Sequence, residues 1–429
     1  MSLKIKLIKE QYYIILPMVC FFLWALLSLI KDNFILVAAD YPSFYDAGKY
    51  IFTEPELVYT TFTSSRFRYL PSFATIFSIM ALFPYHISQW IFFFILLFLG
   101  EFSIKLFNDI LKLKNVNHKP TRFLFLLVLS NGLIITRTFD FLQTKLIVIY
   151  LFLLFLKREI KFRKSEEENI NILKFKFIQF MILVFAISMV PYLAFLILIY
   201  LFDNIKIKEL FSKSQLYNYF LLIMVFVIQN FMFIVSPILI LGFLQYGLRG
   251  FYPPPINLTV SAIKLDENPL PNNTLSSLIS AFNLNIDNSI LILISFGLMI
   301  IVTLFLIINR KMSITQKFGY FMLISLFINI YPRPNALIAL LSLILLLFIV
   351  DIKFEKNIFD YIKQNYLFLF GLISISVLYF MPPLFYLYRV LPFLEIIPLP
   401  LMILRNTFVY TIIISDLYLI NRKKNLNKN

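Results

Sequence analysis

The chain has 429 residues, of which 60% are hydrophobic, 18% aromatic and only 14% charged, with a formal net charge of +16. A soluble domain carries about 25% charged residues, so this composition excludes an ordinary soluble fold and indicates a membrane protein. Lys and Arg stand in short clusters between apolar runs, which is typical of cytoplasmic loops, so we expect no nucleic-acid partner.

The apolar runs predict an all-α polytopic membrane protein, read as one integral membrane domain over residues 1–429 with about twelve transmembrane helices. The first run is too long for a signal peptide and predicts an uncleaved helix. In chain order the runs cover 11–30, 88–107, 122–139, 141–156, 177–190, 191–202, 216–244, 289–308, 318–331, 335–350, 366–386 and 398–420.

Charge placement predicts which side of the membrane each connection faces. With twelve crossings, the basic clusters all fall on one side, which the positive-inside rule makes cytoplasmic together with both termini. The scheme requires that 69–84 does not cross, so we interpret it as an interfacial or re-entrant helix. The clusters are at 4–9, 112–122, 157–164, 206–213, 310–311, 353–356 and 422–428.

The opposite, external side then collects acids, arginines, aromatics and prolines. It holds a first external loop, 32–87, and a second long loop, 245–288, which carries the Asn-x-Thr glycosylation acceptors Asn257 and Asn272. Charged groups at membrane depth cost about 2.5 to 3.5 kcal/mol each on insertion scales. We therefore expect the charges on this side to line a water-filled cavity that binds an anionic group.

Two carboxylates follow the first apolar run, in the stretch DYPSFYDAGKYIF at 40–52. Pro42 disfavours a helical Tyr41, so we expect a short helix from Ser43 to Phe52 with Ser43 as N-cap and Asp46 in its first turn. Asp40 is then available for chemistry. The alternative interpretation is a solvated loop carboxylate.

Cations and aromatic residues follow in the same loop, where Arg66 and Arg68 alternate with Phe67 and Tyr69. Arginine suits phosphate oxygens and tyrosine suits the membrane interface. An anchoring girdle of snorkelling arginines is an equally good interpretation.

Three further segments offer polar side chains on the external side. The turn at 136–145 presents Asp140, Gln143 and Lys145, as a binding site or as a charged, helix-capping turn. Arg333 lies between two prolines, whose rigidity favours an anion contact over a plain anchor. Arg389 is a weaker candidate, because it could pair with Glu395.

These residues resemble the first external loop of the GT-C glycosyltransferases. The closest likeness is to polyprenol-phosphate-mannose-dependent mannosyltransferases, namely glycosyltransferase family 87 and the first mannosyltransferase of GPI-anchor synthesis. It rests on Asp40-Tyr41, Asp46-Ala47 and Phe67-Arg68-Tyr69-Leu70-Pro71, and covers roughly the first third of the chain. The turn at 140–145 is similar to the family's Gly-Gln-x-Asn-like hairpin, with Leu142 in place of glycine and Lys145 in place of asparagine.

The resemblance implies a GT-C-like helix bundle that transfers a sugar, mannose or another hexose, from a polyprenyl-phosphate donor such as dolichol phosphate to a glycan or glycolipid acceptor. Asp40 would be the general base of an inverting reaction, with Arg333 and Arg68 or Lys145 on the donor phosphate. Ala38 stands where the family's Asp-x-Asp motif has its first acid, which argues against a divalent metal.

Two other classes of membrane protein remain as alternatives. A transporter or flippase for lipid-linked sugars would also have many helices and internal charges, but it would be expected to show internal repeats, and none is visible. A non-catalytic scaffold would not need acids and arginines gathered on one side. No cofactor motif is present, since the sequence lacks a Walker A loop, a nucleotide-binding glycine pattern and zinc-ligand spacing.

Overall fold

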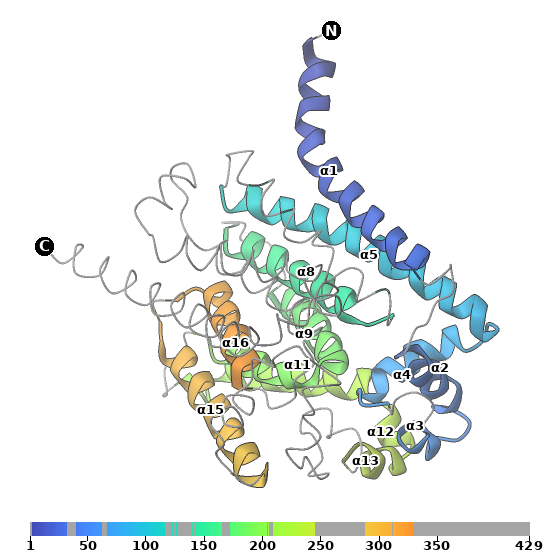
Figure 1. Cartoon of the computed structure of the whole chain (residues 1–429). Coiled ribbons are helices and arrows are strands. Elements are labelled where there is room, and N and C mark those ends of the chain that lie inside the picture. The colour runs from blue at the N-terminus through green and yellow to red at the C-terminus, as the bar shows by residue number, and fades with distance from the viewer. Residues whose placement is uncertain are drawn as a thin grey trace, which may run out of the picture.

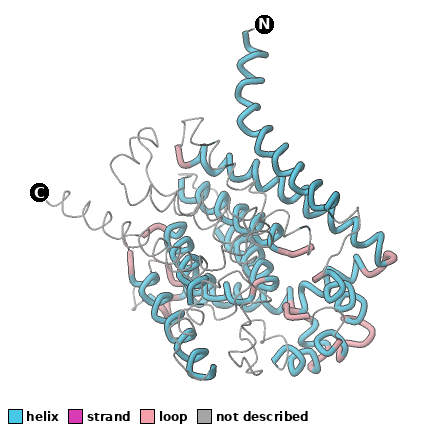
Figure 2. The backbone as a smooth tube through the Cα atoms, viewed as in Figure 1, coloured by secondary structure: helices cyan, strands magenta, loops and turns pink. Residues whose placement is uncertain are grey.

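The computed structural model describes residues 2–31, 40–61, 67–115, 142–164, 172–203, 209–244, 288–310 and 312–328, together with the single residues 122, 126, 139 and 205. Over these residues the chain forms helices joined by turns, without a strand (Figure 2). The expectation of an all-helical chain is therefore confirmed for this part of it. The second external loop, up to residue 287, and every apolar run from 335 onward lie outside the described residues.

The helices are numbered as in Figure 1. They are α1 (Ser2–Lys31), α2 (Tyr41–Tyr50), α3 (Leu57–Thr60), α4 (Pro71–Met80), α5 (Tyr85–Leu113), α8 (Lys145–Lys164), α9 (Ile172–Met189), the 3-10 helix η1 (Pro191–Ala194), α10 (Phe195–Leu201), α11 (Lys213–Gln229), α12 (Met232–Val235), α13 (Ile238–Gly242), α15 (Asn288–Ile308) and α16 (Ile314–Ile328).

Two of the described helices, α5 and α9, are long and apolar enough to cross a membrane. At 1.5 Å per residue, the 29 residues of α5 extend about 44 Å and the 18 residues of α9 about 27 Å, against a hydrocarbon core of about 30 Å. The ten residues of α4 extend only about 15 Å. The helix within the expected 69–84 segment is thus half as long as a crossing requires.

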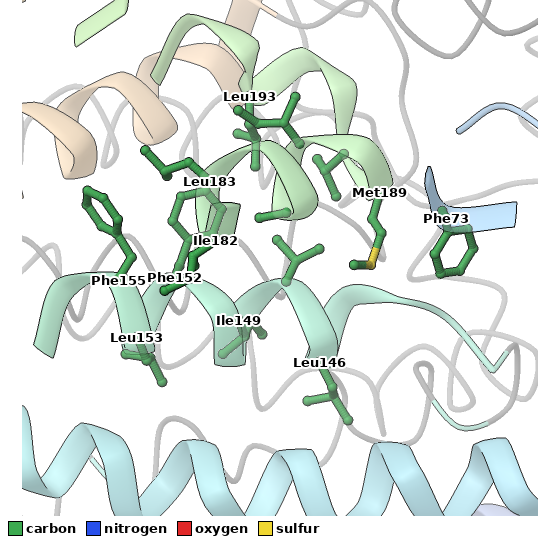
Figure 3. Close-up of a cluster of buried hydrophobic side chains, with 14 of the residues drawn as sticks. Phe73, Leu146, Ile149, Phe152, Leu153, Phe155, Ile182, Leu183, Met189 and Leu193 are labelled. Atoms are coloured by element: carbon green, nitrogen blue, oxygen red, sulfur yellow. The ribbon is translucent and has the colours of Figure 1, made fainter. Parts of the chain in front are cut away.

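The helices stack in a layered series in which each helix covers the next one. α1 packs on α5, α5 on α8, α8 on α9 and α9 on α11, while α15 and α16 pack on each other and on α10 (Figure 1). α8 lies between two neighbours, and its residues 146–156 are apolar on all sides for that reason. Figure 3 shows Leu146 and Leu153 directed toward α5, and Phe152 and Phe155 on the side of α9. These four side chains are buried.

α5 and α8 run in the same direction, so the set of helices has two chemically different ends. Near their C-terminal ends, Lys157 of α8 contacts Asp109 of α5 at 2.5 Å, and Lys164 Nζ donates to the Leu113 carbonyl. α9 runs back, and near its end the Ser188 carbonyl accepts a hydrogen bond from the Leu70 N–H at 3.0 Å. Basic residues therefore gather at one end, and the first loop lies at the other.

One expected segment, 216–244, is not a single helix. α11 ends at Gln229, and the short helices α12 and α13 follow, separated by Ser236 and Pro237. Asn230 holds the break, because its side chain accepts the Ser72 N–H at 3.3 Å and donates to the Phe226 carbonyl at 3.2 Å. Pro237 lacks an N–H and cannot continue the preceding hydrogen-bond series.

The first loop closes on itself at Gly48, where α2 meets α4. A Cβ at this position would lie 2.5 Å from the Phe77 carbonyl carbon and oxygen. Backbone atoms cannot rotate away, so α2 and α4 would have to separate. We expect Gly48→Ala to lower the free energy of unfolding by about 1 to 3 kcal/mol, the usual cost of overpacking.

The matched control for this substitution is Gly297→Ala in α15. No described atom lies within 4 Å of a Cβ built at Gly297, and alanine favours a helix by up to about 1 kcal/mol. Thermal unfolding in detergent should show a lowered apparent Tm for Gly48→Ala and not for Gly297→Ala. Equal melting of the two variants would show that the α2–α4 contact can relax.

Candidate functional site

Asp40 occupies the N-cap position of α2, and its backbone is already helical, with φ −92° and ψ −20°. The helix begins at Tyr41, two residues before the predicted start, because Pro42 is tolerated in a first helical turn. Ser43 is therefore not the N-cap: its Oγ donates to the Asp40 carbonyl at 2.8 Å. Asp46 lies in the middle of α2, so its predicted capping role is wrong.

Tyr41 anchors Asp40 to the rest of the fold. Its side chain is fully buried, and its hydroxyl forms a hydrogen bond with the Ser88 hydroxyl of α5. The rings of Phe77 and Phe92 lie 5.8 and 5.5 Å from its ring centroid. Burial raises the pKa of Tyr41 well above its ordinary value, so the phenol stays neutral and can donate. The backbone next to Asp40 is thereby fixed.

The Asp40 carboxylate meets the turn before α8, 103 residues further along the chain. Gln143 Nε2 donates to Asp40 Oδ2 at 2.8 Å, and Lys145 Nζ donates to Gln143 Oε1. Gln143 is buried, and both Asp40 and Lys145 are half-buried. The structure therefore brings together the first-loop acid and two of the polar residues of the 136–145 turn.

Leu142 gives this turn its shape. Its φ is 47°, in the left-handed region that favours glycine and costs a leucine about 1 to 2 kcal/mol. This is the position where the resemblance expects glycine. The Leu142 side chain is fully buried, and such packing can hold a residue in a costly backbone conformation.

Arg68 and Tyr69 lie in the first loop between α3 and α4. The Tyr69 carbonyl accepts a hydrogen bond from the Tyr59 hydroxyl at 2.9 Å, and its ring packs against Phe44 and Phe73 at about 5.3 Å. Burial raises the pKa of Tyr59, which keeps its hydroxyl a neutral donor. Leu70 then bonds to Ser188 at the end of α9, so this stretch is tied to the same end of the helices as Asp40.

Met189 connects the two halves of the site through apolar packing. It is buried, and Figure 3 shows it between the start of α8, at Leu146, and Phe73 of α4. Met189, Leu146 and Phe73 thus belong to one cluster of buried apolar side chains. The other predicted site residues, Arg66, Asp140, Arg333 and Arg389, lie outside the described residues.

Several residues that support this site were missing from the sequence-based expectations. Ser88 and Asn230 bond to part of the first loop through their side chains, and Ser188 does so through its backbone carbonyl. Ser88 is followed by Gln89 and Asn230 is preceded by Gln229, so each belongs to a polar pair in or beside an apolar run. Polar side chains are costly in a membrane unless they have a partner, and that is the signal which could have identified these two. Within the described residues, no group of three His, Cys, Asp or Glu could hold a metal ion.

A second polar cluster, which we call the far-end cluster, lies at the basic end of the helices. Its charged members are Glu159, Arg163, Asp203 and Lys317. Arg163 contacts Glu159 at 2.8 Å and Asp203 at 2.9 Å, and Lys317 contacts Asp203 at 2.7 Å. Gln179 donates to Glu159 at 3.0 Å. Lys317 is buried at 0% exposure, and its ion pair with Asp203 compensates its charge there.

Comparisons with known protein families, curated proteins and solved structures gave no match to this chain.

Proposed function

We propose that this protein is a multi-pass membrane glycosyltransferase of the GT-C type, which transfers a hexose from a polyprenyl phosphate to a lipid or glycan acceptor. The active site would lie on the external face of the cell membrane, with both termini in the cytoplasm. The observation that carries the proposal is the hydrogen bond between Gln143 and Asp40, because it joins the two segments on which the resemblance rests.

Two further observations support the same proposal. Leu142 has the backbone conformation that the glycine of a Gly-Gln-x-Asn-like hairpin would supply. The first loop, with Arg68 and Tyr69, is tied to the end of α9 at the same end of the helices as the Asp40 site. The first-loop acid, the hairpin amide and the aromatic-Arg-Tyr stretch therefore share one end of the fold.

The proposed reaction is a single inverting displacement. The acceptor hydroxyl oxygen attacks the anomeric carbon from the face opposite the phosphate, and the Asp40 carboxylate takes the hydroxyl proton. The bond between the anomeric carbon and the phosphate oxygen breaks, and polyprenyl phosphate leaves with the electron pair. No general acid is needed, because a phosphate is a good leaving group. Arg333, together with Arg68 or Lys145, would stabilise its charge.

The direct test incubates the purified full-length protein with a panel of radiolabelled polyprenyl-phosphate hexoses and an acceptor membrane extract. We expect label to pass from the donor into acceptor lipid or glycan, with polyprenyl phosphate as the second product. Proteoliposomes that carry labelled donor in one leaflet provide the second arm. Movement of intact donor between leaflets without transfer would favour the flippase alternative and contradict the proposal.

A further inference from the structure

We propose that Gln143 is the positioning residue for the Asp40 carboxylate, and that Lys145 sets the orientation of the Gln143 amide. This inference rests on the proposed function, since it takes Asp40 as the base. It departs from the expectation that Gln143 and Lys145 serve mainly to bind substrate.

The polarity of the three groups allows only one arrangement. An ionised carboxylate only accepts hydrogen bonds, an ammonium only donates them, and a glutamine amide has one end of each kind. Because Lys145 Nζ lies at Oε1, that end must be the oxygen, and the NH₂ end faces Asp40 Oδ2 at 2.8 Å. A rotation of the amide by 180° would place donor against donor and acceptor against acceptor.

Burial makes this arrangement stronger than it would be in water. Gln143 is 7% exposed, so water cannot readily replace its two partners. A hydrogen bond to a charged group is about twice as strong as a neutral one, and a low local dielectric strengthens it further.

The backbone supports the same role for Gln143. Leu142 at φ 47° reverses the chain immediately before Gln143, and α8 begins two residues later, at Lys145. Gln143 is therefore held between a strained turn and a helix whose Leu146 and Ile149 are buried. Strained backbone of this kind is typical of positions where a side chain must be aimed accurately.

The test compares substitutions at the two positions, using the donor and acceptor pair that gives turnover with the wild-type protein. Gln143→Leu removes both hydrogen bonds at similar volume. We expect kcat to fall by about 10²-fold, because a misplacement of about 1 Å costs that much, while the KM for donor changes by less than about threefold. Lys145→Met should give a smaller fall in kcat, and Lys145→Arg, which keeps a cationic donor, should restore most of it.

Gln143→Glu supplies a readout that a purely structural role would not move. At neutral pH the new carboxylate would repel Asp40 and could not donate to it. Repulsion between two neighbouring carboxylates raises the pKa at which the pair takes up its first proton. As the pH falls, that proton restores a group between the two side chains that can donate a hydrogen bond to Asp40. We expect the pH–rate profile of this variant to be displaced toward lower pH, while Gln143→Leu keeps the wild-type shape at reduced height.

The outcomes separate the two proposals. A wild-type protein that transfers no sugar from any donor overturns the proposed function and, with it, this inference. A wild-type protein that transfers sugar, with a Gln143→Leu variant within threefold of its kcat, overturns the positioning role alone. A Gln143→Leu variant that raises KM at unchanged kcat assigns Gln143 to substrate binding and also overturns it. Size-exclusion profiles and melting temperatures identify any variant that fails to fold, and in that case Gln143→Glu alone decides.

Discussion

Asp40→Asn is expected to abolish sugar transfer and to leave the fold intact. Asparagine has nearly the same volume as aspartate, and its amide oxygen can still accept the Gln143 N–H bond that Asp40 Oδ2 accepts at 2.8 Å. It cannot take a proton from an attacking hydroxyl. A general base contributes typically 10² to 10⁴ in rate, so we expect kcat to fall by about that factor, with an unchanged melting temperature.

The control for Asp40→Asn is Glu54→Gln, which neutralises an exposed carboxylate of the same loop. Both variants lose one negative charge from the same loop, so a general effect of charge would appear in both. Initial rates with labelled donor, at saturating acceptor, compare the two directly. If Asp40→Asn retained the full rate, Asp40 would not be the base, and the mechanism would need another carboxylate in that role.

Among the substitutions described, Asp203→Leu is expected to cause the largest loss in the free energy of unfolding. Lys317 is completely buried, and its Nζ lies 2.7 Å from Asp203 Oδ1. Removal of one partner from a buried ion pair leaves an uncompensated charge, at a cost of about 3 to 5 kcal/mol. The double variant Asp203→Leu with Lys317→Met removes both charges and should recover most of that loss, because Arg163 keeps Glu159 at 2.8 Å.

The matched control is Asp109→Asn, which breaks the Lys157–Asp109 pair between α5 and α8. The side chains of this pair are 24% and 45% exposed, and exposed pairs contribute only about 0 to 1 kcal/mol. SDS titration in mixed micelles measures the free energy of unfolding for all four proteins. Equal losses for Asp203→Leu and Asp109→Asn would contradict the interpretation of the far-end cluster as a buried, mutually dependent set of charges.

The far-end cluster is remote from the proposed chemistry, which allows stability and activity to be separated. Lys145 and Glu159 are fourteen residues apart on α8, or about 21 Å along the helix axis. The double variant should therefore transfer sugar at close to the wild-type rate once it is folded. The Gln143 variants should show the reverse, with lowered kcat and unchanged stability.

Several local predictions failed for the same reason. The sequence indicated a helix from Ser43 because a residue before proline disfavours helix, yet α2 begins at Tyr41. The burial of Tyr41 against Ser88 and Phe92 favours that start over the local preference. In the same way, the apolar run 216–244 suggested one helix, and Asn230 ends it by bonding to Ser72 in the first turn of the distant helix α4.

Composition and periodicity by themselves determined that the described chain is helical and that the segment of α5 is long and apolar enough to cross a membrane, because these properties depend on residues adjacent in the chain. The predicted run 177–190 was shorter than α9, which begins at Ile172. Motif spacing identified Asp40, Gln143 and Lys145 as separate candidates. Only the tertiary structure decided that Asp40 meets Gln143, and that ion pairs link Glu159, Arg163, Asp203 and Lys317. The physical reason is that hydrogen bonds and ion pairs depend on distances of about 3 Å between atoms, and these distances are set by how the helices pack, over separations as long as 158 residues.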